Sequence, residues 1–246
     1  MTQKVLAKLI SFAGCDKLGL FKIAIASSCL MIVPQGQVRA ASIFIANHSF
    51  EDPIAPQQPD GYFYSINDIT NWVIGGLSDP GYTAGVDKPV NLPNTSNVFF
   101  TDPIPDGSQV GSSNGRTISQ TLSATLQANT QYTLGAYVGR RLILPNVPSG
   151  YYNIELLAES TVLASNNSIT PLAGEFELVT VNYASGVSDP LIGQALTIRL
   201  TSTSQPHQVN FDNITLDASP IPEPSAILGL LGFGLLGIGS TLKQKR

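Results

Sequence analysis

The chain contains two cysteines, Cys15 and Cys29, and both lie within its first 40 residues. If that segment is removed on export, the domain that follows has no thiol. Disulfide bonds, thiolate metal sites and a cysteine nucleophile are then excluded together. We therefore expect the domain to be stabilised by a sizeable hydrophobic core, with or without a bound cation.

Charged side chains are also scarce, at 12% of the 246 residues, and most of those in the central region are acidic. Between Ala41 and Ile221 there are five basic and fifteen acidic residues. A nucleic-acid partner would require basic side chains to neutralise its phosphates. The sequence therefore predicts no nucleic-acid partner.

Histidine is rare as well, because His48 and His207 are the only two in the chain. Neither lies in a motif that activates a nucleophile or binds zinc. Glu175 and Glu177 share a strand face, but a glycosidase needs two carboxylates that face each other across a sugar. These absences predict that the protein is not an enzyme, with a polysaccharide-acting hydrolase as the least supported alternative.

Residues 1–40 have the order of a secretory signal. Four lysines precede an apolar run from Ile23 to Val33, and the small-residue pattern "QVRAAS" follows. The run is shorter than the ~20 apolar residues that span a bilayer, so a retained N-terminal anchor is the less favoured alternative. We predict a signal peptide over residues 1–40, cleaved after Ala40.

The C-terminus is apolar and ends in basic residues. After Pro222, Glu223 and Pro224, an apolar run extends over residues 226–242, and three basic residues follow. A run of this length lies at the short limit for a transmembrane helix, and its basic end favours the cytoplasmic side. The pattern predicts a transmembrane helix over 226–242 that leaves the main domain outside the cytoplasm.

This tail resembles the PEP-CTERM sorting signal of Gram-negative bacteria in all three of its parts, and the resemblance places the sorting segment at residues 219–246. The resemblance implies that an exosortase-type processing enzyme recognises the motif Pro222, Glu223 and Pro224 and removes the helix. It also implies a protein exported across the inner membrane to the cell envelope, the cell surface or the medium. The membrane anchor would then be transient or lasting.

The region between the two ends, residues 41–218, has the pattern of one all-β domain. Segments such as "QYTLGAYV" and "ALTIRL" alternate apolar and polar residues between clusters of Gly, Pro, Asn and Asp. Alternation with this period is typical of half-buried strands. The region is therefore predicted to fold as a two-sheet antiparallel β-sandwich.

The opening "ANHSFEDP" and the closing "VNFDNITLDA" resemble the first and last strands of galactose-binding-like jelly rolls, a fold found in carbohydrate-binding modules. Weaker matches, including "TNWVI" and "PDGSQV", lie between them in the same order. The resemblance implies an antiparallel jelly-roll β-sandwich. His48 departs from the pattern, which usually has proline there.

The same resemblance implies a structural calcium site with Glu51 and Asp212 as ligands. Oxygen ligands suit a hard cation of this kind. The inward-facing residues change phase between Phe211 and Ile214, which predicts a bulge at Asp212 and Asn213 that re-aims a side chain. The alternative is that both carboxylates are solvated or cap backbone groups.

Aromatic residues concentrate in and around the poorly patterned segment 52–96, and rings with an exposed face stack on sugars. We expect a ligand site that includes Trp72, Tyr82, Arg140 and Arg141. The alternatives are a core position for Trp72 and solvated strand-end charges for the arginines. The predicted function is a non-catalytic cell-surface protein that binds extracellular polysaccharide. The alternative is a structural or adhesive matrix protein without a specific ligand.

Overall fold

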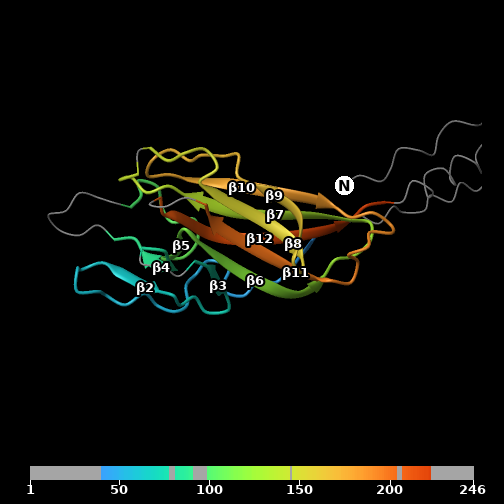
Figure 1. The fold of residues 1–246 in the computed structure, drawn as a ribbon, viewed down its shortest axis with the longest axis horizontal. Helices are drawn as coiled ribbons and strands as arrows, with labels where there is room; N and C mark the ends of the chain where they lie inside the picture. Colours follow the sequence, from blue (N-terminus) through green and yellow to red (C-terminus); the bar gives the residue numbers. More distant parts are fainter. Residues whose placement is uncertain (1–39, 78–80, 91–98, 145, 204–206, 223–246) are drawn as a thin grey trace, which may run out of the picture. The chain divides into compact units, whose positions relative to one another are not determined.

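The structure is a computed structural model that describes residues 40–77, 81–90, 99–144, 146–203 and 207–222. The described residues form antiparallel strands and contain no helix, so the all-β prediction is confirmed. The strands build two facing sheets of a jelly-roll sandwich (Figure 1). The predicted signal peptide and the predicted transmembrane helix over 226–242 lie outside the described residues, apart from Ala40.

The larger sheet contains β1 (Ala41–Ser42), β2 (Phe63–Ile66), β4 (Thr83–Lys88), β5 (Val110–Asn114), β7 (Thr130–Gly139), β10 (Phe176–Ala184) and β12 (Val209–Pro220). Its strands run in the order β10-β7-β12-β5-β4-β2, and β1 pairs with β12. The smaller sheet contains β3 (Val73–Gly76), β6 (Arg116–Thr125), β8 (Tyr152–Ala158), β9 (Thr161–Asn166) and β11 (Ala195–Ser202). Its order is β3-β6-β11-β8-β9.

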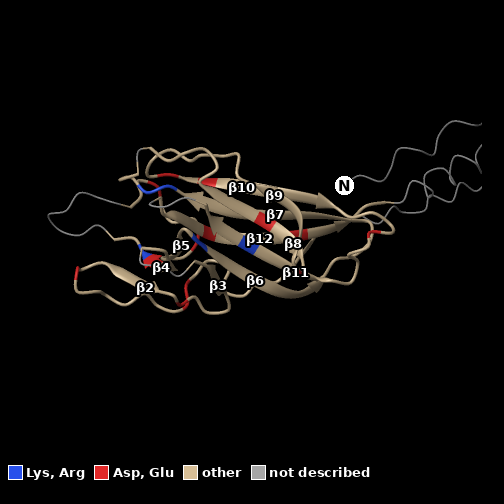
Figure 2. Ribbon diagram, in the orientation of Figure 1, with Lys and Arg blue, Asp and Glu red and all other residues tan. Residues whose placement is uncertain are grey.

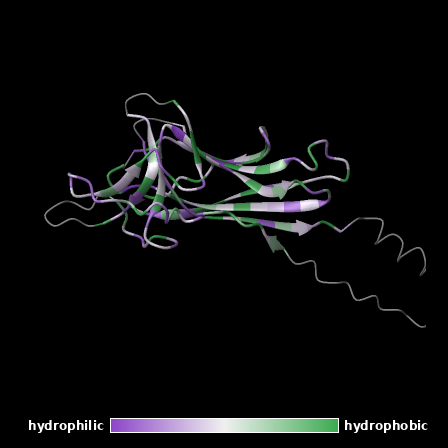
Figure 3. Cartoon of the chain, turned by 90° about the horizontal axis from the view of Figure 1, so that it is seen from below, coloured by the Kyte–Doolittle hydropathy of each residue, from purple (hydrophilic) through white to green (hydrophobic). Residues whose placement is uncertain are grey.

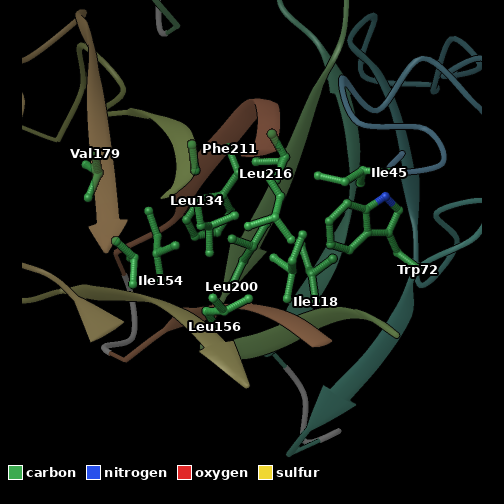
Figure 4. Packing of buried hydrophobic residues seen from close by; sticks show 14 of the residues in the cluster. Ile45, Trp72, Ile118, Leu134, Ile154, Leu156, Val179, Leu200, Phe211 and Leu216 are labelled. Atoms are coloured by element: carbon green, nitrogen blue, oxygen red, sulfur yellow. The ribbon is translucent and has the colours of Figure 1, made fainter. Parts of the chain in front are cut away.

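The core lies between the two sheets and follows the alternation in the sequence (Figure 4). On β7, Leu134, Ala136 and Val138 point inward, and on β11 Ile198 and Leu200 do the same. Hydrophobic stripes alternate with polar ones along the strands (Figure 3), as expected when one face of each sheet is buried. The burial of these side chains provides the core that a domain without disulfides requires.

Charged residues are sparse on the strands (Figure 2). One pair lies on the outer face of the five-stranded sheet, where Arg199 Nε donates to Glu155 Oε2 over 2.5 Å. A second pair, between Asp87 and Arg141, lies on the outer face of the seven-stranded sheet. This second pair belongs to the candidate site.

Candidate functional site

A row of outward-facing residues crosses six strands of the seven-stranded sheet near one of its ends. The cross-strand partners in this row are Phe176, Gly139, Asn210, Ser112, Gly85 and Ile66. Their neighbours Val209 and Phe211 belong to the core, so the row lies on the opposite face. The middle of the row therefore has small or amide side chains, which leave room above the sheet.

A cavity of about 200 Å³ lies over this row. Its lining includes Tyr64, Gly85, Asp87, Ser112 and Arg141. Tyr64 on β2 is directly opposite Asp87 on β4, so the tyrosine and the carboxylate lie side by side. The cavity thus combines an aromatic ring, a carboxylate and a guanidinium within one hollow, which we call the cleft.

Asp87 and Arg141 form a largely buried ion pair in the cleft. Arg141 Nη2 lies 2.6 Å from Asp87 Oδ2, and Gln208 Nε2 donates to the same oxygen over 2.8 Å. Arg141 Nε donates to Asn210 Oδ1 over 3.3 Å. Removing either charge would leave its partner uncompensated in a poorly hydrated site, so separating the pair is costly. The charge-assisted hydrogen bond therefore holds both side chains in fixed positions.

Aromatic side chains continue from the arginine toward β10. The guanidinium carbon of Arg141 lies 4.6 Å from the centre of the Phe99 ring. Phe99 contacts Tyr62 and Phe100, with ring centres 5.8 and 6.4 Å apart, and Phe100 packs on Phe176 at 4.3 Å. These rings pack behind Arg141, since Phe99 and Phe100 are buried, and the aromatic ring in the lining of the cleft is that of Tyr64. An aromatic ring beside a buried charge pair suits a ligand that is apolar and aromatic and carries one polar or cationic group.

The bulge that the sequence predicts is confirmed, because the register of β12 on β7 shifts between Asp212 and Thr215. Asp212 Oδ2 accepts a hydrogen bond from the Asp106 amide over 2.9 Å, and Oδ1 accepts one from the Asn213 amide over 2.7 Å. Glu51 Oε1 accepts hydrogen bonds from two further amides of the same loop, those of Ser108 and Gln109, both over 2.7 Å. The two predicted calcium ligands are therefore brought to the same loop, residues 106–109.

Burial, with smaller contributions from the nearby carboxylates of Asp106 and Glu51, raises the pKa of Asp212 to about 7 against the lowering effect of two backbone hydrogen bonds. His48 Nε2 lies 3.2 Å from Asp106 Oδ2 at the edge of this group. Within the described ranges, no three ligating side chains gather around one point. Glu51 and Asp212 thus bind the same loop, and the calcium site that they would form stays a prediction.

The structure places the four residues of the predicted ligand site in different surroundings. Trp72 is 6% exposed, packs on Phe50 with ring centres 5.2 Å apart and donates Nε1–H to Asn47 O, so it is a core residue. Tyr82 is half-buried just before β4. Arg140 donates to the carbonyl groups of Leu144 and Pro171. Of the four, Arg141 alone lines the cleft.

Sequence reasoning missed the partners of Arg141. Asp87 lies 54 residues from Arg141, and Asn210 lies 69 residues from it. A carboxylate in the alternating strand "TAGVDK" looks like any solvated outward residue. The available signal was Gly85, two residues earlier on the same face, because a glycine within a strand often marks a close approach.

The sorting motif begins directly after β12. Ile221 N–H donates to Asn129 O over 2.6 Å, and Pro222 follows it. Glu223 and Pro224 lie outside the described residues. Among the residues whose placement the structure describes, no helix has the length and apolar character needed to cross a membrane.

Two sequence families match the chain. The HpiC1-like family, described as HpiC1 cyclase, matches residues 41–217, and the PEP-CTERM protein-sorting motif matches residues 220–244. The second match confirms the predicted sorting motif. It indicates an exported protein of the cell envelope that is processed by an exosortase. No curated protein matches the chain.

Solved cyclases share the fold. The Stig cyclase Fisc from Fischerella sp. TAU, in complex with (3Z)-3-(1-methyl-2-pyrrolidinylidene)-3H-indole, is 28% identical over 75% of this chain and 100% of its own, with a TM-score of 0.61. A cyclase from the same source holds 4-(1H-indol-3-yl)butan-2-one, at 28% identity, the same coverage and a TM-score of 0.60. An apo cyclase from Fischerella sp. is 27% identical over 75% of this chain and 98% of its own, with a TM-score of 0.62.

These matches overturn one prediction. The expectation of a protein that is not an enzyme is wrong, because the family that covers residues 41–217 is a cyclase family and the solved relatives are cyclases. The carbohydrate-binding modules that also match have TM-scores of 0.37 and 0.40, too low to bear on function. The absence of a histidine- or cysteine-based motif does not exclude an enzyme whose chemistry needs neither.

Proposed function

Because the chain belongs to the HpiC1-like cyclase family, we propose that it is an exported cyclase that closes a ring in an aromatic substrate of the indole class. One observation carries the choice of site. The buried pair of Asp87 and Arg141 lies beside the Tyr64 ring in a cleft on the outer face of the seven-stranded sheet. The substrate class is taken from the indole ligands of the solved relatives.

The side chains of the cleft suit such a reaction. A proton from water adds to the unsaturated side chain, whose π electron pair forms the new C–H bond, and the resulting carbocation accepts a π electron pair of the indole as the carbon–carbon bond forms. The ring then regains its aromatic π system by losing a proton, so the substrate gains one proton and loses one. The electron pair of the broken C–H bond returns to the ring, and the proton goes to the Asp87 carboxylate and then to water. Arg141 is a positioning residue that holds this carboxylate, while the Tyr64 ring in the lining of the cleft stabilises positive charge on the substrate.

Binding of 4-(1H-indol-3-yl)butan-2-one, measured by calorimetry, tests the site. We expect saturable binding that Ser112→Trp abolishes, because the larger ring fills the cleft. Val73→Trp places the same ring on an exposed strand of the other sheet and is the matched control. Equal binding by the two variants would place the ligand elsewhere and overturn the assignment of the cleft.

We also propose a structural calcium ion between Glu51 and Asp212. Their carboxylates accept from the amides of Asp106, Ser108 and Gln109 in loop 106–109, and Asp212 is fully buried, so a cation beside them would offset the cost of burying charge. Calcium should raise the thermal midpoint of the EDTA-treated protein, and Glu51→Gln with Asp212→Asn should remove that shift. An unchanged midpoint with calcium would refute the site.

Membrane insertion of residues 226–242 before processing is a further part of the proposal, supported by the sorting motif that they follow. Association with extracellular polysaccharide stays a prediction. Flotation of the chain with lipid vesicles, compared with a chain that ends at Pro222, tests the insertion. Equal flotation of the two would contradict it.

A further inference from the structure

Both ends of the described domain leave it at the same place. The last residues of β12 pair with the start of β7, up to Pro220 opposite Thr130. Strand β1 pairs with the same stretch, with Ala41 opposite Ala218, and the Ile43 amide donates to Leu216 O over 2.8 Å. The two segments that the sequence assigns to export and sorting are therefore joined to adjacent strands.

The sorting motif follows the sheet without a linker. Five residues, 221–225, separate the last paired residue, Pro220, from the apolar run that begins at residue 226. A chain spans at most ~3.6 Å per residue, so this connection reaches about 20 Å when fully extended. The headgroup layer on each side of a bilayer is itself about 5–7 Å thick. An inserted tail would thus hold this end of the domain close to the lipid headgroups.

The surface at this end, which we call the strand-end surface, consists of residues 126–129, 159–160, 185–194 and 217–222. Hydrogen bonds fix its loops: Ser185 Oγ donates to Gln127 O, and the Leu126 amide donates to Gln194 O. Its exposed apolar side chains are Val187 at 69%, Ile192 at 39% and Ile221 at 39%. It carries three acidic residues and no basic residue. A rigid apolar surface without basic side chains fits zwitterionic lipid better than an anionic membrane.

The cleft lies toward the opposite end of the same strand. Asn210, which accepts a hydrogen bond from Arg141 beside the cleft, and Pro220 at the strand-end surface are ten residues apart on β12. At about 3.3 Å per residue, the strand separates them by roughly 30 Å. The long axis of β12 in Figure 1 shows this separation.

We propose that the strand-end surface rests on the outer surface of the membrane until the tail is removed, so that the cleft is held away from the bilayer and takes its substrate from the aqueous side. This inference rests on the proposed insertion of residues 226–242. It assigns a role to Val187, Ile192 and Ile221, which the cyclase site does not use.

Site-specific fluorescence tests the orientation. Residues 41–246 contain no cysteine, and the solved cyclase Fisc matches 75% of this chain over its full length, so we expect the domain to fold without the first 40 residues. Val187→Cys and Ile143→Cys each provide one labelling position; Ile143 is 53% exposed in the turn after the cleft end of β7. Each labelled chain is incorporated into phosphatidylcholine vesicles with and without a quencher at headgroup level.

Loss of fluorescence at position 187, with no change at 143, would support the proposal, and a chain ending at Pro222 should show no loss at either position. Equal quenching at both positions, or none at either, would overturn it in chains that float with the vesicles. Chains that do not float would also overturn it, through failure of the proposed insertion. If position 187 is quenched only in vesicles that contain the processing enzyme, the strand-end surface contacts that enzyme and not lipid, which would also overturn the proposal.

Discussion

Two neighbouring tyrosines have hydroxyl groups in opposite surroundings. Tyr151 and Tyr152 are both fully buried, with ring centres 5.2 Å apart. Tyr152 donates to Ile169 O over 2.6 Å, whereas the hydroxyl of Tyr151 has no hydrogen-bond partner among the described residues. Burial raises the pKa of both groups, to about 12 for Tyr152, so both remain neutral at physiological pH.

The first prediction compares these two hydroxyls. Leaving a buried polar group without a partner costs about 1–3 kcal/mol, while a satisfied hydrogen bond contributes ~1 kcal/mol. Tyr151→Phe should therefore raise the free energy of unfolding by about 1 kcal/mol, and Tyr152→Phe should lower it by a similar amount. Urea denaturation of the two variants measures both changes. Destabilisation by Tyr151→Phe would show that its hydroxyl is satisfied.

A second prediction concerns Tyr183, whose hydroxyl donates to Asp189 Oδ2. This contact raises the pKa of Tyr183 to about 12 and lowers the pKa of Asp189. Because the folded pKa of Asp189 is depressed, its contribution to stability is present above its ordinary pKa and is lost as the pH falls through the folded value. Tyr183→Phe should raise the pKa of Asp189 toward 3.8, which NMR titration of its side chain measures. An unchanged pKa would mean that the hydroxyl has no such effect.

At the scale of the elements, β2 approaches β4 closely beside the cleft. A Cβ atom added at Gly85 would lie 1.8 Å from Ser65 O, so β2 depends on glycine at this position. Since β2 carries Tyr64, this contact also sets the position of one wall of the cleft. The backbone of the two strands and the shape of the cleft are therefore coupled.

Gly85→Ala should lower the free energy of unfolding by about 1–3 kcal/mol, because the added methyl group forces the strands apart. It should also weaken indole binding. Gly186→Ala is the matched control, since an added Cβ there has no neighbour within 4 Å. Denaturation curves and calorimetry give the two effects. Equal stability of the two variants would contradict the close approach of β2 to β4.

Strand-level features followed from the sequence because they depend on local pattern. The alternation in "QYTLGAYV" identified the buried face of β7, and the phase change between Phe211 and Ile214 identified the bulge in β12. The pairing of Asp87 with Arg141 depends on strand order, which joins residues 54 positions apart, so local pattern did not reveal it. Trp72 looked like a ligand-stacking residue because one sequence does not distinguish an exposed ring from a buried one.

At the scale of the whole molecule, the fold and the activity were not equally predictable. The jelly-roll sandwich follows from strands, turns and a hydrophobic core, but one fold supports many activities. Carbohydrate binding was an inference from the fold and stays a prediction, whereas the match to a cyclase family corrected the expectation that the protein is not an enzyme. The cleft explains why the sequence did not reveal an active site, since its aromatic ring and its charge pair, Tyr64, Asp87 and Arg141, come from three separate segments of the chain.

The most direct test of the proposed function is the conversion of an indole that bears an unsaturated side chain, followed by chromatography and mass spectrometry. The account predicts a product of unchanged mass with a new ring, formed by the wild-type domain. Asp87→Asn should slow its formation at least tenfold while binding of 4-(1H-indol-3-yl)butan-2-one persists. An unchanged rate in Asp87→Asn would contradict the proposed role of the carboxylate, and the absence of any ring-closed product from a panel of such indoles would contradict the proposed indole cyclase activity.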